Sequence, residues 1–494
     1  MIFLIVFVSF IGLSWLVHYL YVTLVAFKYW KRRRVPHFKN PRYPLGNISF
    51  RVLTSMPVTS FLEELYSTMD GPYMGLMLHT RRALLLKDPE LINRILVTDF
   101  HYFNSRIEVD LSADPFFGSF FILHDERWKY FRQKLSPIFA PNRLRGVMNS
   151  IETKYENLEQ YFEASSDLSF DFYSLMKRYV VDTMSASLLG IDVDFLNNPH
   201  DDIRLMTEEA IPVCTRTVFT FFFALLAPNL KHKLRYNFFT RNVEEFSVQL
   251  VDSLLKMKNS TNFIQKLSEI RKESLREDGD NNFPLELLAA QVFIVLLAGY
   301  EATGGTIAYC MWHLAKNPDI QIKAQAEVDA VIRKHGKITH ESMSELTYIK
   351  NCINETLRLN PTLTFLIRLC NKDYHCEKYD LMIEKNTFAV IPLTGIHTDE
   401  KYYPKPHEFD PNRFLPEERA KRPSGTYMPF GNGQRFCFGK QMAKLIDIYT
   451  VGRLLQNYTI KLNDKSHQEK IEMEPMTPLL SPVGGCHLSL VKRC

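Results

Sequence analysis

One cysteine, Cys437, lies in a short glycine-bearing loop whose residue types suit metal ligation. The loop, residues 430–439, reads FGNGQRFCFG and is followed at once by the long amphipathic stretch 440–456. A thiolate there would lie near a helix N-terminus, where backbone N–H groups and the helix dipole favour negative charge. Such a thiolate is a good axial ligand for haem iron, and it pushes electron density toward cleavage of an O–O bond.

Other readings of this loop are weaker. Gly431 and Gly433 could begin a dinucleotide-binding loop, but Phe436 stands where the third glycine belongs. Zinc would need a second thiol or a histidine pair at ligand spacing, and the sequence contains no C-x-x-C. A buried cysteine in a turn, without chemistry, is the remaining alternative.

The apolar stretch 285–316 is predicted to form one very long helix, because Pro284 precedes it and Pro318 follows it. Its middle, residues 298–305, reads AGYEATGG. Each glycine inside a helix costs about 1 kcal/mol relative to alanine, so three glycines within seven positions need a compensating reason. The reason is either the close approach of a flat cofactor, first of all at Gly299, or a kink that opens a cavity for O₂ and water. Packing against another helix is the alternative.

Two charged residues lie three positions apart in the predicted helix 345–359. Glu355 and Arg358 therefore share one helical face. On a surface helix such a pair contributes only a few tenths of a kcal/mol. Further along the chain, residues 411–414 read PNRF and supply another arginine, Arg413.

These motifs, taken together, resemble the cytochrome P450 family of haem-thiolate monooxygenases. The resemblance extends from about residue 28 to the C-terminus and is greatest to the microsomal members of insects. It implies a mainly α fold with a small β region, in which haem b is buried between the long central helix and the cysteine loop. It further implies that Cys437 ligates the iron, that Arg435 binds a haem propionate and that Phe430 packs beside the cysteine.

The resemblance also implies roles for residues outside the loop. Glu355, Arg358 and Arg413 would form a buried cluster that fixes the scaffold of the cysteine loop, and removal of one partner typically costs 3–5 kcal/mol. The two propionates need cations, preferably arginines with their fork of donors. The family positions matched here, besides Arg435, are Trp128, Arg132 and Arg368. Each of these alone would more often be a surface residue.

One position departs from the family pattern. In the family, an acid in the long helix is followed by a threonine, and the two deliver protons. Glu301 matches the acid, but Ala302 stands at the threonine position, and Thr303 is roughly 100° further round the helix. Three functions remain open: a monooxygenase in which Glu301 and Thr303 handle protons, a haem-thiolate isomerase or dehydratase, and a weakly active or non-enzymatic haem protein.

The N-terminal segment predicts a membrane anchor. Residues 1–27 contain no Lys, Arg, Asp or Glu, and a helix of that length spans roughly 40 Å, more than the ~30 Å hydrocarbon core. A cleaved signal peptide would need a basic start and a shorter apolar region. Positive charge follows the segment instead, which keeps that end in the cytosol. We therefore expect a transmembrane signal anchor at 1–27, a basic and proline-rich hinge at 28–47, and a single haem-binding monooxygenase domain at 48–494 on the cytosolic face of the endoplasmic reticulum.

Composition bounds the partners. A net charge of +5 is too small to favour nucleic acid, and eight scattered cysteines suit a reducing compartment. The chain has no nicotinamide or flavin fingerprint of its own. The resemblance implies O₂ as co-substrate and electrons from NADPH through a flavoprotein reductase, with cytochrome b5 as a further candidate partner. A basic face for an acidic donor, or merely a solvated surface, is expected at Lys129, Lys134, Lys440, Lys444 and Arg453.

The remaining patterns concern the surroundings of the site. Residues 319–334 read as an amphipathic helix, 74–87 and 363–392 as strands of a small sheet, and 271–283 as a solvated connector. The apolar run 218–226 either dips into lipid near a substrate entrance or is simply buried. Apolar side chains at the family's pocket positions indicate a lipophilic substrate, either a foreign compound such as an insecticide or an endogenous hormone or lipid. These side chains are Phe116, Phe117, Phe121, Phe293, Leu297, Leu363, Phe365, Leu366, Leu480 and Val483.

Overall fold

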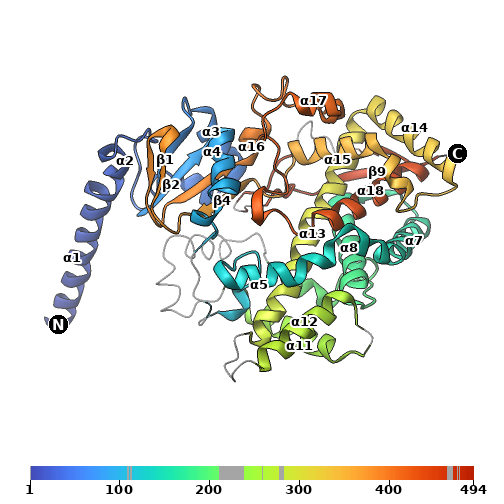
Figure 1. Ribbon diagram of the computed structural model, residues 1–494, viewed down its shortest axis with the longest axis horizontal. Helices are drawn as coiled ribbons and strands as arrows, with labels where there is room; N and C mark the ends of the chain where they lie inside the picture. The colour runs from blue at the N-terminus through green and yellow to red at the C-terminus, as the bar shows by residue number, and fades with distance from the viewer. Residues whose placement is uncertain are drawn as a thin grey trace.

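Helix α13 (Leu285–Lys316) runs through the middle of the molecule, and the other helices pack around it (Figure 1). It is buried along most of its length, so it carries apolar residues on nearly every side. Among the described residues it is the one helix long and apolar enough to cross a membrane, but 61% of its apolar window is buried inside the protein. The predicted helix 285–316 is confirmed, and it serves as the core of the fold.

The computed structural model describes residues 2–107, 111, 114–210, 238–258, 260–276, 283–463, 471–475, 477 and 479–493. The predicted run 218–226 lies outside these residues. The helices that surround α13 come from both halves of the chain. They are α5 (Asp125–Leu135), α7 (Met148–Ala164), α8 (Phe172–Met184), α11 (Arg241–Lys256), α12 (Asn262–Arg276), α14 (Pro318–His335), α15 (Thr347–Leu359) and α18 (Lys440–Asn457).

The prediction of a solvated connector over 271–283 is wrong for its first part. Helix α12 continues to Arg276, and Ser274 within it is buried. At the other end Phe283 stacks on Tyr130, with ring centroids 5.2 Å apart, and meets Phe131 edge-on. The charged composition of this segment did not predict these contacts, because each contact is made by a single side chain. Residues 277–282 lie outside the described part of the chain.

A small sheet forms the second part of the molecule, as predicted from 74–87 and 363–392. Its strand order is β1–β2–β7–β4, antiparallel except for the parallel pair β2–β7. These strands are mostly buried, so they read as apolar runs rather than as alternating patterns. The strands are β1 (Tyr73–Leu78), β2 (Arg81–Leu86), β4 (Phe365–Leu369) and β7 (Phe388–Pro392).

Five further strands complete the β structure of the described residues. Strands β3, β9 and β8 form a three-stranded sheet in that order, and β5 pairs with β6. Smaller helices join the two parts, among them α3 (Val58–Ser67), α4 (Pro89–Asn93), α16 (Leu393–His397) and α17 (Pro416–Ala420). The strands are β3 (Ser169–Asp171), β5 (Tyr374–Cys376), β6 (Leu381–Ile383), β8 (Tyr458–Leu462) and β9 (His487–Lys492).

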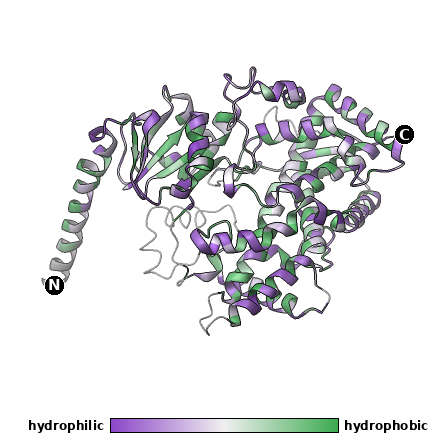
Figure 2. Cartoon of the chain, in the orientation of Figure 1, coloured by the Kyte–Doolittle hydropathy of each residue, from purple (hydrophilic) through white to green (hydrophobic). Residues whose placement is uncertain are grey.

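The apolar core is divided between these two parts. One cluster of buried side chains surrounds α13, and a second lies around the β1–β2–β7–β4 sheet. In Figure 2 the strands of this sheet are mostly green, whereas α7 at the edge of the molecule is largely purple. The mainly α fold with a small β region is therefore confirmed.

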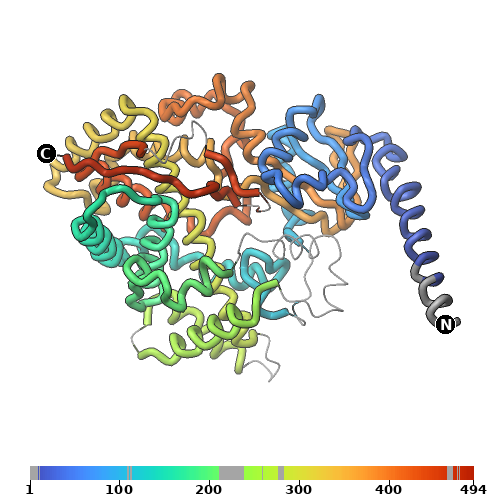
Figure 3. Tube along the Cα trace, turned by 180° about the vertical axis from the view of Figure 1, so that it is seen from behind, coloured from blue at the N-terminus to red at the C-terminus, as the bar shows by residue number. Residues whose placement is uncertain are grey.

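Helix α1 (Ile2–Leu24) projects from the body beside the sheet (Figures 1 and 3). The segment after it is tied to strand β1: Trp30 is buried and its indole N–H donates to the Leu76 carbonyl at 3.1 Å. A Cβ on Gly75 would come within 2.6 Å of the Trp30 ring, so glycine is needed there. The Phe38 N–H also donates to the Gly75 carbonyl at 2.9 Å. The anchor and the domain boundaries stay predictions.

Candidate active site

A cavity of about 540 Å³ lies between helix α13, the β1–β2–β7–β4 sheet and the loop that carries Cys437. Most of its lining side chains are apolar. The exceptions include four arginines, one carboxylate on α13 and the threonines beside it. Cys437 lines this cavity and is exposed within it. The cavity therefore brings the cysteine loop and the central helix to one site.

The cysteine loop is held in a tight conformation by its own backbone. The Asn432 side chain caps the short helical turn Gly433–Arg435, and the Cys437 N–H donates to the Phe430 carbonyl at 2.7 Å. Gly433 has φ +69°, and a Cβ there would come within 1.8 Å of the Leu96 carbonyl oxygen, so no other residue fits. Helix α18 then begins at Lys440, directly after the loop.

Burial and nearby donors and cations shift the pKa of the Cys437 thiol in opposite directions. Burial raises the pKa of Cys437 above its usual value, and the Gly439 N–H and three nearby cations oppose this shift. The cations are Arg132, Arg106 and Lys440. A cationic metal at the sulfur would favour the thiolate further, because metal coordination deprotonates a thiol outright.

Four arginines converge on the cavity from separate elements. Arg132 comes from α5, Arg368 from β4 and Arg435 from the cysteine loop, as the sequence predicted, and Arg106 joins them from a loop. Burial and mutual repulsion lower the pKa of Arg435 to about 9, and burial lowers the pKa of Arg368 to about 10. The region around these arginines therefore contains more positive than negative charge.

The arginines are only partly satisfied by the protein. Arg132 donates to the Phe436 carbonyl at 3.1 Å, and the Arg435 guanidinium lies 4.4 Å from the Trp128 ring centroid. No described residue forms an ion pair with any of the four arginines. The Nε atoms of Arg368 and Arg435 are buried and have no hydrogen-bond partner among the described residues. An anionic group with two carboxylates, such as haem with its two propionates, fits this arrangement.

Arg106 was not among the sequence-predicted residues. It donates to the Phe121 carbonyl, and its guanidinium lies 4.0 Å from the Phe121 ring centroid. Burial, together with the neighbouring arginines, lowers the pKa of Arg106 well below its usual value. No motif or helical spacing surrounds it in the sequence, so local reasoning had no signal for its position.

The acid and the threonine of α13 both line the cavity, together with Ala302. Thr303 is buried, and its hydroxyl makes no hydrogen bond to a described residue. The Thr306 hydroxyl donates to the Ala302 carbonyl at 2.7 Å. Thr303 therefore faces the site in spite of its offset from position 302, and its hydroxyl is free to bond to a molecule in the cavity.

The glycines of α13 serve helix packing. A Cβ on Gly299 would come within 1.9 Å of the Met184 sulfur, and a Cβ on Gly304 within 2.6 Å of the Lys177 Cα. Both neighbours belong to α8, which packs closely along α13. The alternative reading, packing through glycines, thus accounts for the cost of glycine here. Gly299 also lines the cavity, and its role in cofactor binding stays a prediction.

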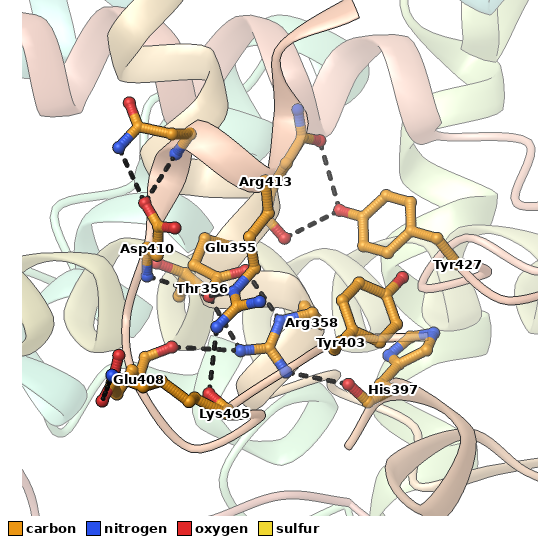
Figure 4. Close-up of polar contacts among 12 residues, drawn as sticks. Glu355, Thr356, Arg358, His397, Tyr403, Lys405, Glu408, Asp410, Arg413 and Tyr427 are labelled. Atoms are coloured by element: carbon orange, nitrogen blue, oxygen red, sulfur yellow. Dashed lines mark hydrogen bonds and ion pairs between the residues drawn. The ribbon is translucent and has the colours of Figure 1, made fainter. Parts of the chain in front are cut away.

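The structure brings Glu355, Arg358 and Arg413 together, as predicted (Figure 4). Arg358 donates twice to the Glu355 carboxylate, at 2.7 and 2.8 Å, and both side chains are fully buried. Arg413 Nε lies 3.4 Å from the same carboxylate, and the Asp410 N–H donates to it at 3.0 Å. Burial raises the pKa of Glu355, and these cationic and N–H neighbours oppose the shift.

This cluster is connected to the segment that leads into the cysteine loop. Arg358 donates to the His397 carbonyl at 2.8 Å, and the ring of His397 accepts the Met428 N–H at 3.0 Å. Tyr427 donates to the Asn354 carbonyl at 2.9 Å, next to Glu355 in α15 (Figure 4). The helix and the loop are thus held by bonds on both sides of the ion cluster.

Aromatic side chains surround the substrate part of the cavity. Phe116 and Phe293 pack against Phe239, with ring centroids 5.7 and 4.6 Å apart. Eight of the ten apolar residues expected there line the cavity. Leu480 and Val483 do not, and Leu479 takes their place. Leu480 instead packs in the core, and its carbonyl accepts the Tyr309 hydroxyl at 3.0 Å.

The expected basic face is smaller than predicted. Arg453 pairs with Glu159 at 2.9 Å and is mostly buried, so it belongs to the interior. Lys129 and Lys134 also have acidic partners. Lys440 and Lys444 make no ion pair with a described residue, and with Arg419 they line a pocket of about 140 Å³ behind Phe430.

Comparison with known proteins decides the family. The family model described as Cytochrome P450 matches residues 36–487. The chain belongs to the cytochrome P450 family. It is therefore a monooxygenase of the kind that binds haem and uses O₂. The resemblance drawn from the cysteine loop and the helix motifs is confirmed.

The similar curated proteins are insect cytochromes P450. Probable cytochrome P450 6a20 of Drosophila melanogaster is 28% identical over 494 residues, covering 97% of each chain. Cytochrome P450 6B6 of Helicoverpa armigera is 29% identical, covering 96% of each. Cytochrome P450 6a2 of Drosophila melanogaster is 30% identical, covering 97% of each. The likeness extends over the whole P450 chain rather than over the motifs alone.

Proposed function

We propose that this P450 is anchored in the endoplasmic reticulum and oxidises lipophilic small molecules with O₂ and electrons from NADPH, delivered by a flavoprotein reductase. One observation carries the proposal: a largely apolar cavity brings Cys437 together with four arginines that form no ion pair with a described residue. Cys437 holds the iron of haem b, and the arginines bind the propionates. Trp128 and Phe430 enclose the cofactor.

Haem held by a thiolate supplies O–O bond cleavage. In the net reaction one oxygen atom enters the substrate and the other becomes water, with two electrons from NADPH and two protons consumed. The phenylalanines bind the substrate and exclude water. Glu301 carries protons to the cavity, and the Thr303 hydroxyl, which bonds to no described residue, supplies the hydrogen bond that Ala302 lacks.

The anchor is supported by α1 and by the charges that follow it. Phe10, Leu13 and Val17 of α1 are more than half exposed, at 70%, 61% and 59%, which suits lipid contact rather than water. Five Lys and Arg between 28 and 34 keep the following body in the cytosol. There the body is accessible to a membrane-bound reductase, with cytochrome b5 as a second donor.

Ala302 favours a second candidate function, a haem-thiolate isomerase or dehydratase that acts on an oxidised lipid. Such a reaction rearranges an existing O–O bond and needs no protons delivered for O₂ reduction. Turnover of a lipid hydroperoxide without reductase, and no product from NADPH and O₂, would support this candidate. Product formed only with NADPH and reductase supports the monooxygenase.

The test is the reduced carbon-monoxide difference spectrum of microsomes that contain wild type, Cys437→Ser or Cys376→Ser. We expect the thiolate-type Soret band in the wild type and in Cys376→Ser, because Cys376 is buried in β5 and does not line the cavity. Cys437→Ser should lack it. A thiolate-type band that survives in Cys437→Ser would refute the assignment.

A further inference from the structure

A buried lysine, Lys177 of α8, is joined to the acid of α13. Its Nζ lies 2.8 Å from Glu301 Oε1, and the two side chains are only 11% and 17% exposed. The ammonium also lies 4.1 Å from the Tyr300 ring centroid and 4.7 Å from that of Tyr173. Lysine is rarely buried unless it is paired. The burial of this lysine beside Glu301, at the wall of the cavity, therefore needs an explanation.

The main chain at Lys177 has little freedom. A Cβ on Gly304 would come within 2.6 Å of the Lys177 Cα and 2.8 Å of its backbone nitrogen. Glycine at 304 therefore allows α8 to approach α13 closely at this point. Glu301 lies one turn before Gly304 on the same helix. The close packing of α8 on α13 therefore places the Lys177 side chain beside the Glu301 carboxylate.

A tyrosine holds the other carboxylate oxygen. The Tyr173 hydroxyl, also from α8, lies 3.2 Å from Glu301 Oε2 and 3.3 Å from the Ser481 hydroxyl. Tyr300 donates to the exposed Glu208 at 3.4 Å. Polar groups therefore continue from Glu301, which lines the cavity, through Tyr173 to the half-buried Ser481.

We propose that Lys177 and Tyr173 are positioning residues that hold Glu301 for proton delivery and connect it to solvent. The inference rests on the proposed monooxygenase function and deepens it. Lys177 Nζ passes a proton to Glu301 Oε1, Glu301 releases that proton into the cavity, and solvent reprotonates Lys177. Two such transfers supply the two protons of each turnover, and NADPH supplies the two electrons. The contacts from α8 align the Glu301 carboxylate, a role that a hydroxyl at position 302 would otherwise have.

The test compares Lys177→Met, Lys177→Arg and Tyr173→Phe with Lys154→Met. Lys154 is an apt control, because it is another buried lysine, 5% exposed and 2.6 Å from Asp192, but it does not line the cavity. Each variant is assayed as full-length protein in microsomes with reductase, using a substrate that the wild type oxidises. The readouts are product formed per NADPH consumed, peroxide released, the solvent deuterium isotope effect and turnover supported by an organic hydroperoxide.

We expect Lys177→Met to lower the product per NADPH about tenfold, less than the roughly 10²–10⁴-fold that proton transfer contributes in enzymes, because Glu301 itself remains. Peroxide release and the solvent isotope effect should rise, and hydroperoxide-supported turnover should stay within about twofold of wild type, because that route needs no protons for O₂ reduction. Lys177→Arg should recover most of the coupling, and Tyr173→Phe should lose less than Lys177→Met. The C–O stretching frequency of the reduced carbon-monoxide complex should shift in Lys177→Met and not in Lys154→Met.

Two outcomes would overturn the inference. One is an equal loss of coupling in Lys177→Met and Lys154→Met, since that loss would come from weakened folding alone. The other is a hydroperoxide-supported rate that falls as far as the NADPH-supported rate. Absence of the thiolate-type spectrum in the wild type would instead refute the proposed function. Failure of the inference and failure of the proposed function are therefore distinguishable.

Discussion

Replacement of Arg358 by methionine tests how the interior supports the cysteine loop. The change removes two hydrogen bonds to the Glu355 carboxylate, at 2.7 and 2.8 Å, and leaves that fully buried group with Arg413 and one N–H. Breaking a buried ion pair in this way costs about 3–5 kcal/mol. An unfolding entropy of about 2.1 cal/mol/K per residue gives roughly 1 kcal/mol/K for a chain of this size, so the melting temperature should fall by about 3–5 °C.

The damage should reach the haem before it reaches the helices. Arg358 is linked through His397 to Met428, which precedes the cysteine loop, so the loop loses support when the arginine is absent. In a urea titration of Arg358→Met we expect the Soret absorbance to change at lower urea than the far-ultraviolet circular dichroism. In the wild type the two signals should change together.

A matched control is Arg493→Met. Arg493 also makes a two-pronged contact with a carboxylate, Asp329, at 3.1 and 2.7 Å, but the side chains are 23% and 37% exposed. Its loss should cost about 1 kcal/mol or less and should not separate the two signals. The double variant Glu355→Leu/Arg358→Met should recover part of the loss, because the fully buried carboxylate is then absent together with Arg358, although Arg413 loses its ion pair with Glu355. Equal effects of the Arg358 and Arg493 single variants would refute the reasoning.

Three further outcomes are expected. Arg368→Leu should speed haem transfer to apomyoglobin about tenfold, because it removes a propionate partner worth about 1.4 kcal/mol; an unchanged rate would remove Arg368 from the site. Gly304→Leu should prevent the close approach of α8 at Lys177 and lower the melting temperature by several degrees, whereas Gly146→Ala, which meets nothing within 4 Å, should not. Burial lowers the pKa of His397 to about 3, so between about pH 3 and pH 6.5 the unfolded state binds one more proton than the native state, and stability is lost as the pH falls through this range. In His397→Gln the slope of unfolding free energy with pH in this range should be smaller by up to about 1.4 kcal/mol per unit.

Local signals in the sequence predicted the elements that surround the site. Proline on either side of 285–316 set the bounds of α13, and the three-residue spacing of Glu355 and Arg358 placed both on one face of α15. Such features depend on residues close together in the chain, where helical geometry alone fixes their relation.

Contacts between distant segments could not be predicted in the same way. The sequence left open whether the glycines of α13 approach a flat cofactor, open a kink or pack against another helix, and the structure shows Gly299 and Gly304 against α8, more than a hundred residues earlier. Arg106 reaches the cavity from a loop with no repeating pattern, so only the folded chain shows it beside Arg435. The partner of Glu301 belongs to the same class, since nothing in the sequence around Lys177 marks it as buried.

The Glu355 cluster and the cavity that contains Cys437 differ in whether their buried charges are balanced. Around Glu355, cations and carboxylate are matched within the protein, and the cluster is closed to any ligand. In the cavity the arginines repel one another and keep buried Nε atoms without partners, an arrangement that costs free energy until an anion arrives. Evolution tolerates such a cost where binding offsets it. Unmatched buried charge of this kind supports the proposed haem site, and removal of haem should lower the stability of the arginine-lined part of the cavity more than that of the Glu355 cluster.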